Sequence, residues 1–216
     1  RLIAVVLHTW NRQGKAYRLA NSGDLQIFEE ARKYLVKTRR ELFDRWGFDP
    51  VPDEYGPPKD THRAVGSQLP LYGFKKWGDL FNARQKLALI TFVEKARQAY
   101  EKMLTEGLGE EYARAVATYL ALTLDKLIMF SSSNCTWKVD TTQIINAFVG
   151  RQALQMTWDY FEMNPVSGVS ASWPNLLKVL ESSFSILKGV DSPAFAVQGS
   201  ATSLPYPDDF FDAVIT

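Results

Sequence analysis

Apolar residues recur at a spacing near 3.6 in four long stretches of the chain, and this spacing predicts four helices. The four stretches are residues 22–46, 77–104, 110–130 and 173–187. In the first stretch we expect Ser22 or Asp24 to accept an N-cap hydrogen bond and Gly47 to end the helix. The stretch 110–130 is apolar on nearly every side, so we expect it to be the central, buried helix.

Shorter patterns lie between these stretches. Residues 2–8 and 15–20 are apolar or alternate in polarity, and they flank the turn residues 11–14, which predicts a β-hairpin. Residues 141–148 and 152–163 are expected to form two short helices.

Two further regions are irregular or extended. Proline and glycine interrupt residues 48–74, which predicts a long loop or an extended arm. Residues 194–198 and 211–215 have the composition of short buried strands, and the intervening residues 199–209 are rich in turn formers. The predicted fold is therefore mainly α with a small α/β part.

The composition is that of an ordinary globular protein. The chain has 216 residues, of which 46% are hydrophobic and 23% charged, and these fractions exclude disordered, collagen-like and low-complexity chains. A single cysteine excludes a disulfide framework and a cysteine-based zinc site, and we expect a reducing, cytoplasmic location. No apolar run reaches the roughly 18–20 residues of a transmembrane helix, so no membrane partner is expected.

Charge is distributed unevenly along the chain. Residues 1–102 contain 19 Lys/Arg and 12 Asp/Glu, whereas residues 103–216 contain 6 Lys/Arg and 12 Asp/Glu. Two interpretations stay open: the basic half binds a polyanion, or its charges are ordinary solvated helix faces.

Common catalytic and metal-binding motifs are absent from the sequence. It has no phosphate-binding glycine loop, no H-E-x-x-H and no G-x-S-x-G. The two histidines, His8 and His62, are expected to be a structural strand residue and a solvated loop residue. Cys135 is expected to be a small buried residue, and no metal site is expected.

The C-terminal segment carries the sharpest motif. It reads AVQGSA at 196–201, LPYPDD at 204–209 and FDAVIT at 211–216. This order resembles class I S-adenosylmethionine-dependent methyltransferases, in the stretch from the third to the fourth strand of their Rossmann-like sheet. In such sheets ligands bind beyond the carboxyl ends of the strands. The resemblance implies that the cofactor is contacted by Gly199, Ser200, Ala201 and Leu204. In the family an Asp usually stands where this chain has Ser200, which is a weaker acceptor without charge.

Three further blocks point to a narrower group. They are WGDLFNARQ at 77–85, SSSNCTW at 131–137, and FVGRQAL at 148–154, which continues through WDY at 158–160 to EMNP at 162–165. These blocks resemble adenine-specific DNA methylases in which a long helical insertion separates the cofactor-binding glycine loop from the catalytic Asp-Pro-Pro-Tyr box. The likeness covers most of the chain from Trp77 on, and residues 1–46 more weakly.

The resemblance implies an internal fragment of such an enzyme. The glycine loop is expected before Arg1 and the catalytic box directly after Thr216. The fragment is then expected to contain no catalytic residue and to be inactive alone. The expected segments are a β-hairpin plus helix (1–47), a Pro/Gly-rich loop or arm (48–76), a helical insertion domain (77–190) and a partial methyltransferase sheet (191–216).

The same resemblance implies the partners of the complete protein. It would transfer a methyl group from S-adenosylmethionine to the N6 atom of a flipped adenine in DNA, in restriction-modification or phage defence. Exposed edges of the partial sheet would favour a homo-oligomer.

Basic and aromatic residues near position 77 are candidates for DNA contact. The candidate residues are Lys75, Lys76, Trp77, Arg84 and Lys86. Cations at a helix N-terminus favour a phosphate, and the neighbouring Tyr72, Phe74 and Trp77 can stack on unpaired bases. The alternative is that these aromatic residues belong to the core of a loop–helix junction.

A second candidate set consists of polar residues among apolar neighbours: Asn134, Arg151, Gln152, Asp159 and Asn164. They are expected either to line a cofactor or base pocket or to be hydrogen-bonded polar groups at helix ends. Two alternatives to the DNA methylase also remain. One is a non-enzymatic helical nucleic-acid-binding or interaction module, and the other is an enzyme of the same fold that acts on RNA or protein.

Overall fold

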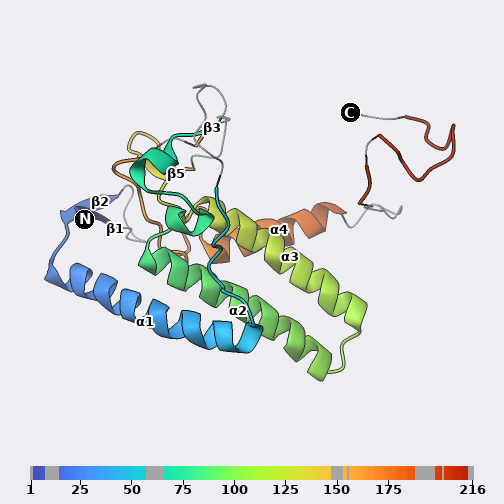
Figure 1. Cartoon of the computed structure of the whole chain (residues 1–216), viewed down its shortest axis with the longest axis horizontal. Helices are drawn as coiled ribbons and strands as arrows, with labels where there is room; N and C mark the ends of the chain where they lie inside the picture. Colours follow the sequence, from blue (N-terminus) through green and yellow to red (C-terminus); the bar gives the residue numbers. More distant parts are fainter. Residues whose placement is uncertain are drawn as a thin grey trace. The chain divides into compact units, whose positions relative to one another are not determined.

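The structure is a computed structural model, and its chain divides into two compact units, Arg1–Leu180 and Glu181–Thr216. The residues it describes are 2–7, 15–56, 66–146, 153–154, 156–187, 198–200 and 202–213. The described residues are mainly helical with a small β part, as the sequence predicts. Figure 1 shows the long helices α1, α2 and α3 of the first unit lying beside one another.

The first unit begins with the predicted β-hairpin. Strands β1 (Ala4–Leu7) and β2 (Ala16–Leu19) pair antiparallel, with Ala4 opposite Leu19 and Leu7 opposite Ala16. The hairpin leads directly into helix α1.

Helix α1 spans Ser22–Trp46 and ends at Gly47, which has a left-handed φ of 75° as expected of a C-terminal glycine. Its N-cap is Asn21, so the prediction of Ser22 or Asp24 was wrong. The Asn21 side chain accepts from the backbone N–H of Asp24, and the Asp24 carboxylate accepts from the backbone N–H of Asn21. Asp24 therefore closes a capping box from inside the first turn.

The segment after α1 is tied to the chain around Trp77 by backbone hydrogen bonds. Gly56 N–H donates to the Lys75 carbonyl at 2.9 Å, and Trp77 N–H donates to the Glu54 carbonyl at 3.1 Å. A short helix η1 (Leu69–Tyr72) and a two-residue strand β3 (Gly66–Ser67) follow within the stretch predicted to be a loop. Strand β3 pairs parallel with β6 (Ala153–Leu154).

The helix predicted over 77–104 is in fact two elements. A 3-10 turn η2 covers Trp77–Leu80, Phe81 is extended, and helix α2 covers Ala83–Thr105. Asn82 is the N-cap of α2 and forms a capping box with Gln85. The apolar period continues across this break, which is why the pattern alone predicted one helix.

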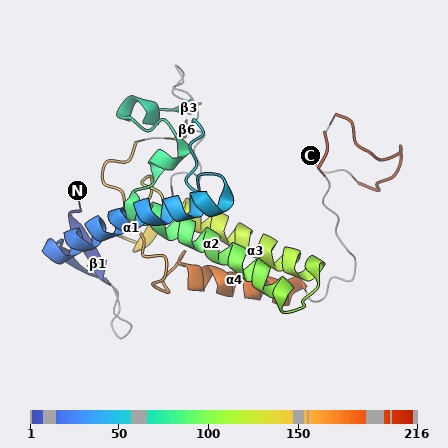
Figure 2. The ribbon, with the colours of Figure 1, turned by 60° about the horizontal axis from the view of Figure 1, so that its bottom comes forward.

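Helix α2, and not the more apolar α3 (Glu110–Met129), occupies the middle of the helical layer. It packs against α1 on one side and α3 on the other (Figure 2). Only one side of α3 is buried, and residues such as Leu122, 58% exposed, lie on its outer face. The prediction of a central, buried α3 was therefore wrong.

Two apolar clusters hold the first unit together. Between α1 and α2 the buried residues are Leu35, Leu42, Val51 and Ile90. The second cluster joins α2 and α3 to the chain before and within α4 (Trp173–Leu187), and its buried residues are Leu89, Leu124, Leu127, Met163 and Ala171. Helix α4 has the bounds that the sequence predicts.

The prediction of two short helices after α3, at 141–148 and 152–163, is wrong. Strands β4 (Thr136–Lys138) and β5 (Gln143–Ile145) form an antiparallel hairpin in place of the first. The described part of 152–163 contains β6 and irregular chain in place of the second. These segments are too short for the periodicity of apolar residues to separate helix from strand.

The second unit begins with the last residues of α4, and its other described residues, 198–200 and 202–213, are rich in turns. Ser200 and Ser203 form an isolated bridge, and residues 211–213 are not in a strand. Residues 194–197 and 214–216, on which the two predicted strands mostly depend, lie outside the described residues, as do His8 and His62. No helix in the described ranges is both long and apolar enough to cross a bilayer.

Candidate functional site

Three segments far apart in the sequence meet in one hydrogen-bonded cluster, which we call the three-segment junction: residues 77–85, 131–137 and 158–165. The backbone N–H and the hydroxyl of Ser133 both donate to the Leu80 carbonyl, at 2.7 and 2.8 Å. The N–H of Phe161 donates to the Cys135 carbonyl at 2.7 Å. Each of the three segments is thus bonded to at least one of the others.

Side chains complete the three-segment junction. The Asn82 amide donates to the Glu162 carboxylate at 2.7 Å and to the Tyr160 hydroxyl at 3.0 Å. The Trp137 and Phe161 rings stack with centroids 4.7 Å apart. The Asn82 hydrogen bonds therefore hold the N-cap of α2 to the third segment, and the ring stack joins the second segment to the third.

Arg84 belongs to the same polar network. Its guanidinium donates two hydrogen bonds to Glu162, at 2.7 and 2.8 Å, and lies over the Phe28 ring at 5.2 Å. The hydrogen bonds to Glu162 raise the pKa of Arg84 above its ordinary value. Arg84 was predicted to contact DNA, but two of its N–H groups are engaged by Glu162 within the protein.

The other predicted cations have different surroundings. Lys76 lies 3.4 Å from Asp53 and 5.8 Å from the centre of the Tyr55 ring. Partial burial lowers the pKa of Lys86. Lys75 is exposed and forms no ion pair with another described residue. Because α2 starts after Asn82, the phosphate site expected at a helix N-terminus beginning at Trp77 is not formed there.

The segment 131–135 is buried and polar. Asn134 is 2% exposed, and its side-chain nitrogen has no hydrogen-bond partner among the described residues; the same holds for the Ser131 hydroxyl and the Gln85 side-chain nitrogen. Cys135 is fully buried, as predicted, and burial raises the pKa of its thiol. A thiol in this setting is a poor nucleophile.

The residues predicted to line a pocket differ in how far they are buried. Asn134 is buried, whereas Asp159 and Asn164 are exposed. The Asn164 side-chain oxygen accepts from the backbone N–H of Val166 and so supports a turn. Arg151 and Gln152 lie outside the described residues.

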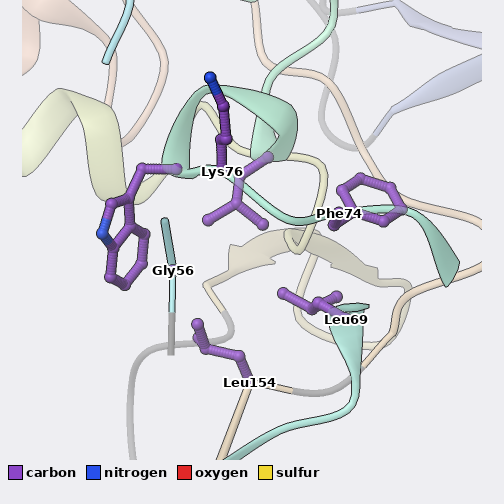
Figure 3. A pocket seen from close by; sticks show the side chains of 7 residues that line it. Gly56, Leu69, Phe74, Lys76 and Leu154 are labelled. Carbon is purple, nitrogen blue, oxygen red and sulfur yellow. The ribbon is translucent and has the colours of Figure 1, made fainter. Parts of the chain in front are cut away.

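A small hollow opens beside this region (Figure 3). Its lining residues are Gly56, Leu69, Phe74, Lys76, Trp77, Leu80 and Leu154. In the figure the Lys76 side chain turns its amino group away from the Leu69 and Leu154 side chains. The hollow measures about 10 Å³, which is hardly enough for one water molecule. It is too small for a nucleobase or a cofactor.

Three exposed aromatic side chains, Tyr55, Tyr72 and Trp158, are not among the residues that line the hollow. Tyr72 and Trp158 contact each other edge to face, with ring centroids 5.1 Å apart. They are 46% and 74% exposed, and Tyr55 is 76% exposed. Sequence analysis named Tyr72, but neither Tyr55 nor Trp158, as a residue that can stack on bases, because apolar periodicity does not predict exposure in irregular chain.

The predicted cofactor residues belong to the second unit. Gly199, Ser200 and Leu204 are exposed, and Ala201 lies outside the described residues. The Ser200 hydroxyl bonds with the Thr202 hydroxyl at 2.8 Å and accepts from the Thr202 N–H at 3.3 Å. Within the described residues no three His, Cys, Asp or Glu side chains are grouped to hold a metal ion.

Compared with protein-family models, curated proteins and solved structures, the chain shows no significant match to any of them.

Proposed function

We propose that this chain is part of a DNA adenine-N6 methyltransferase. S-adenosylmethionine would be the cofactor of the complete protein and DNA its partner. The helical unit would supply target recognition or a scaffold, and the C-terminal segment would belong to the cofactor side of a Rossmann-like sheet.

The observation that carries this proposal is the three-segment junction. The three segments of the junction, 77–85, 131–137 and 158–165, lie within the blocks that resemble adenine-specific DNA methylases, the third of which begins at residue 148. They are bonded to one another through Ser133, Asn82 and Phe161. Chance similarity of short blocks gives no reason for them to share one structural cluster.

The C-terminal residues are compatible with one side of a cofactor site. The Ser200 hydroxyl can accept a hydrogen bond from an adenine amino group, although it carries no charge. When bound, S-adenosylmethionine would supply the methyl group. The chain's own part would be limited to contacts by Gly199, Ser200, Ala201 and Leu204, with no catalytic residue of its own.

The test is an assay of methyl transfer from tritiated S-adenosylmethionine to DNA, followed by nucleoside analysis. The complete gene product that contains this chain is expected to form N6-methyladenine, and the 216-residue chain alone is expected to form none. Methylation of cytosine, RNA or protein by the complete product, or of nothing, would contradict the proposal.

The second candidate is a helical nucleic-acid-binding module without enzymatic activity. The exposed aromatic residues Tyr55, Tyr72 and Trp158 favour it. The residues encoded after Thr216 distinguish the two candidates at little cost, because an Asp-Pro-Pro-Tyr sequence supports the methyltransferase and its absence supports the binding module.

A further inference from the structure

We propose that the three-segment junction binds one internal water molecule, which bridges the side chains of Gln85, Ser131 and Asn134. We call these three residues the buried polar layer. The bound water joins the start of α2 to the chain that follows α3. This inference concerns the helical unit alone and does not depend on the proposed function.

The three side chains of the buried polar layer are almost fully inaccessible to solvent. Gln85 is 4% exposed, Ser131 5% and Asn134 2%. The Gln85 and Asn134 side-chain nitrogens and the Ser131 hydroxyl have no hydrogen-bond partner among the described residues. Burial of such a group without a partner is costly, and folded proteins contain few of them. Three of them at one place indicate a further hydrogen-bonding group.

The packing of α2 on α3 brings Gln85 and Ser131 together. The two helices are joined by residues 106–109 alone, so the start of α2 lies beside the end of α3 (Figure 1). Leu89 of α2 and Leu127 of α3 belong to one buried cluster. Gln85 precedes Leu89 by one helical turn. Ser131 follows Leu127 by one turn, and its backbone N–H donates into the last turn of α3. Residues one turn apart share a helix face, so Gln85 and Ser131 form the next layer beyond the two leucines.

Hydrogen bonds bring Asn134 to the same place. The Gln85 side-chain oxygen accepts from the backbone N–H of Asn82 at 2.9 Å, which holds the Gln85 amide against the N-cap of α2. Two residues before this N-cap, the Leu80 carbonyl accepts two hydrogen bonds from Ser133. Asn134 follows Ser133 directly in the chain. The contact between the start of α2 and the segment after α3 is therefore fixed from both sides.

The chemistry of the free atoms selects water as the ligand. The Gln85 and Asn134 nitrogens are donors, and the Ser131 hydroxyl can donate or accept. A water molecule can accept from both amides and donate to the hydroxyl, which gives it the three hydrogen bonds that buried waters typically make. All three side chains are uncharged, so they suit a neutral ligand better than an ion. Their near-complete burial suits the smallest such ligand.

The direct test is a high-resolution crystal structure of the 216-residue chain. It is expected to show one water oxygen about 2.7–3.2 Å from Gln85 Nε2 and from Asn134 Nδ2, and within hydrogen-bond distance of Ser131 Oγ. Amides that bond directly to protein groups, an empty site, or an ion in place of the water would overturn the inference.

The sign of a stability change tests the same inference in solution. Ser131→Ala removes a single oxygen atom. If that oxygen binds the bridging water, the melting temperature is expected to fall by about 2–4 °C, the shift for losing one hydrogen bond. If no water is bound, the substitution removes an unpaired buried hydroxyl, and the melting temperature rises or stays unchanged. Either of these results would overturn the inference.

A double-mutant cycle shows whether Ser131 and Asn134 share one ligand. Asn134→Leu removes the second partner at similar side-chain size. Ser131→Ala is expected to lower the melting temperature less in the Asn134→Leu background than in the wild type, because the water is already lost there. Equal effects in the two backgrounds would overturn the inference. Circular dichroism checks that each variant folds.

The matched control is Thr123→Val. Thr123 lies on the same helix and is 7% exposed, but its hydroxyl donates to the Tyr119 carbonyl at 2.8 Å. It precedes Ser131 by about two turns, or roughly 12 Å along the axis. Thr123→Val is therefore expected to change the melting temperature by the same amount in the wild-type and Asn134→Leu backgrounds. A coupling as large as that of Ser131→Ala would show that Asn134→Leu disturbs the helix generally, and would remove the support for a shared water.

Discussion

Arg84 and Glu162 are 78 positions apart in the sequence, yet the Arg84 guanidinium donates two hydrogen bonds to the Glu162 carboxylate. Both side chains are largely buried, with exposed fractions of 25% and 18%. The same carboxylate accepts from the N-cap residue of α2, Asn82. The Glu162 side chain thus bonds the segment that leads to α4 to the start of the central helix α2.

Glu162→Gln is expected to lower the free energy of unfolding by about 2 kcal/mol, because it leaves the Arg84 charge partly buried without its partner. Urea denaturation followed by circular dichroism measures the change. Glu110→Gln is the matched control, since Glu110 pairs with Arg114 on an exposed helix face, where a pair contributes less than about 0.5 kcal/mol. Equal effects of the two substitutions would contradict a structural role for the Arg84–Glu162 pair.

The long helices could be predicted from the sequence because burial of one face imposes a period on 15 or more residues. The bounds of α1 and α4 follow from that period and from Gly47. The start of α2 was missed, although Asn82 followed three positions later by Gln85 is a readable capping signal. Because the apolar period also includes Trp77 and Leu80, the pattern did not show that α2 starts only after Asn82.

The centre of the helical layer could not be predicted from apolarity alone. Helix α3 is the more apolar sequence, but α2 has neighbours on both sides. Which helix lies in the middle depends on how helices are ordered in space, and a one-dimensional pattern does not contain that order. The three-segment junction was missed for the same reason: the sequence marked the three blocks but gave no sign that Ser133 bonds to Leu80.

The engagement of Arg84 was equally invisible in the sequence. A basic residue near a helix start suits a phosphate as well as a carboxylate, and only the fold brings Glu162 to it. Exposure of Trp158 is likewise a property of irregular chain, for which no periodicity exists.

Gly78→Ala is expected to destabilise the protein by about 1–3 kcal/mol, within the usual range for overpacking. A Cβ atom at this position would lie 2.6 Å from the Pro52 carbonyl oxygen and 2.9 Å from a Val51 methyl, so the backbone has to shift. The shift would also strain the Gly78–Pro52 backbone hydrogen bond. The melting temperature, measured by differential scanning calorimetry, reports the loss.

Gly56→Ala is the control for this substitution. Among the described residues its added Cβ would meet only the Lys75 carbonyl, at an ordinary 3.8 Å, so a change within about 0.5 kcal/mol is expected. Equal melting temperatures for Gly78→Ala and Gly56→Ala would show that the short distance from Gly78 to Pro52 does not exclude a side chain at position 78.

Asp49→Asn is expected to remove an acid-sensitive part of the stability. Hydrogen bonding to Arg39 holds the pKa of Asp49 below its ordinary value of 3.8 in the folded protein. A depressed folded pKa gives stability that is present above pH 3.8 and is lost as the pH falls through the folded pKa. The difference between wild type and variant should therefore be about 1 kcal/mol at pH 7 and should shrink as the pH falls below 3.8.

Urea titrations at a series of pH values measure this difference. Glu106→Gln is the control, because Glu106 pairs with Lys102 at 3.5 Å on an exposed helix end. It should differ from wild type by less than about 0.5 kcal/mol at every pH. A difference for Asp49→Asn that does not shrink at any pH below 3.8 would show that the carboxylate charge is not responsible.

If the proposed function is right, Ser200→Asp is expected to tighten binding of S-adenosylmethionine by the complete gene product about tenfold. The prediction rests on the proposed placement of Ser200 at the cofactor's adenine, where a charged acceptor forms a hydrogen bond about twice as strong as a neutral one. The backbone N–H of Thr202, which now donates to the Ser200 hydroxyl, can donate to the carboxylate instead, so the turn is retained. Isothermal titration calorimetry with S-adenosylmethionine measures the affinity, and Ser203→Asp, which adds the same charge three positions later, is the control. Unchanged or weaker binding by Ser200→Asp, or equal gains in both variants, would remove Ser200 from the proposed cofactor site.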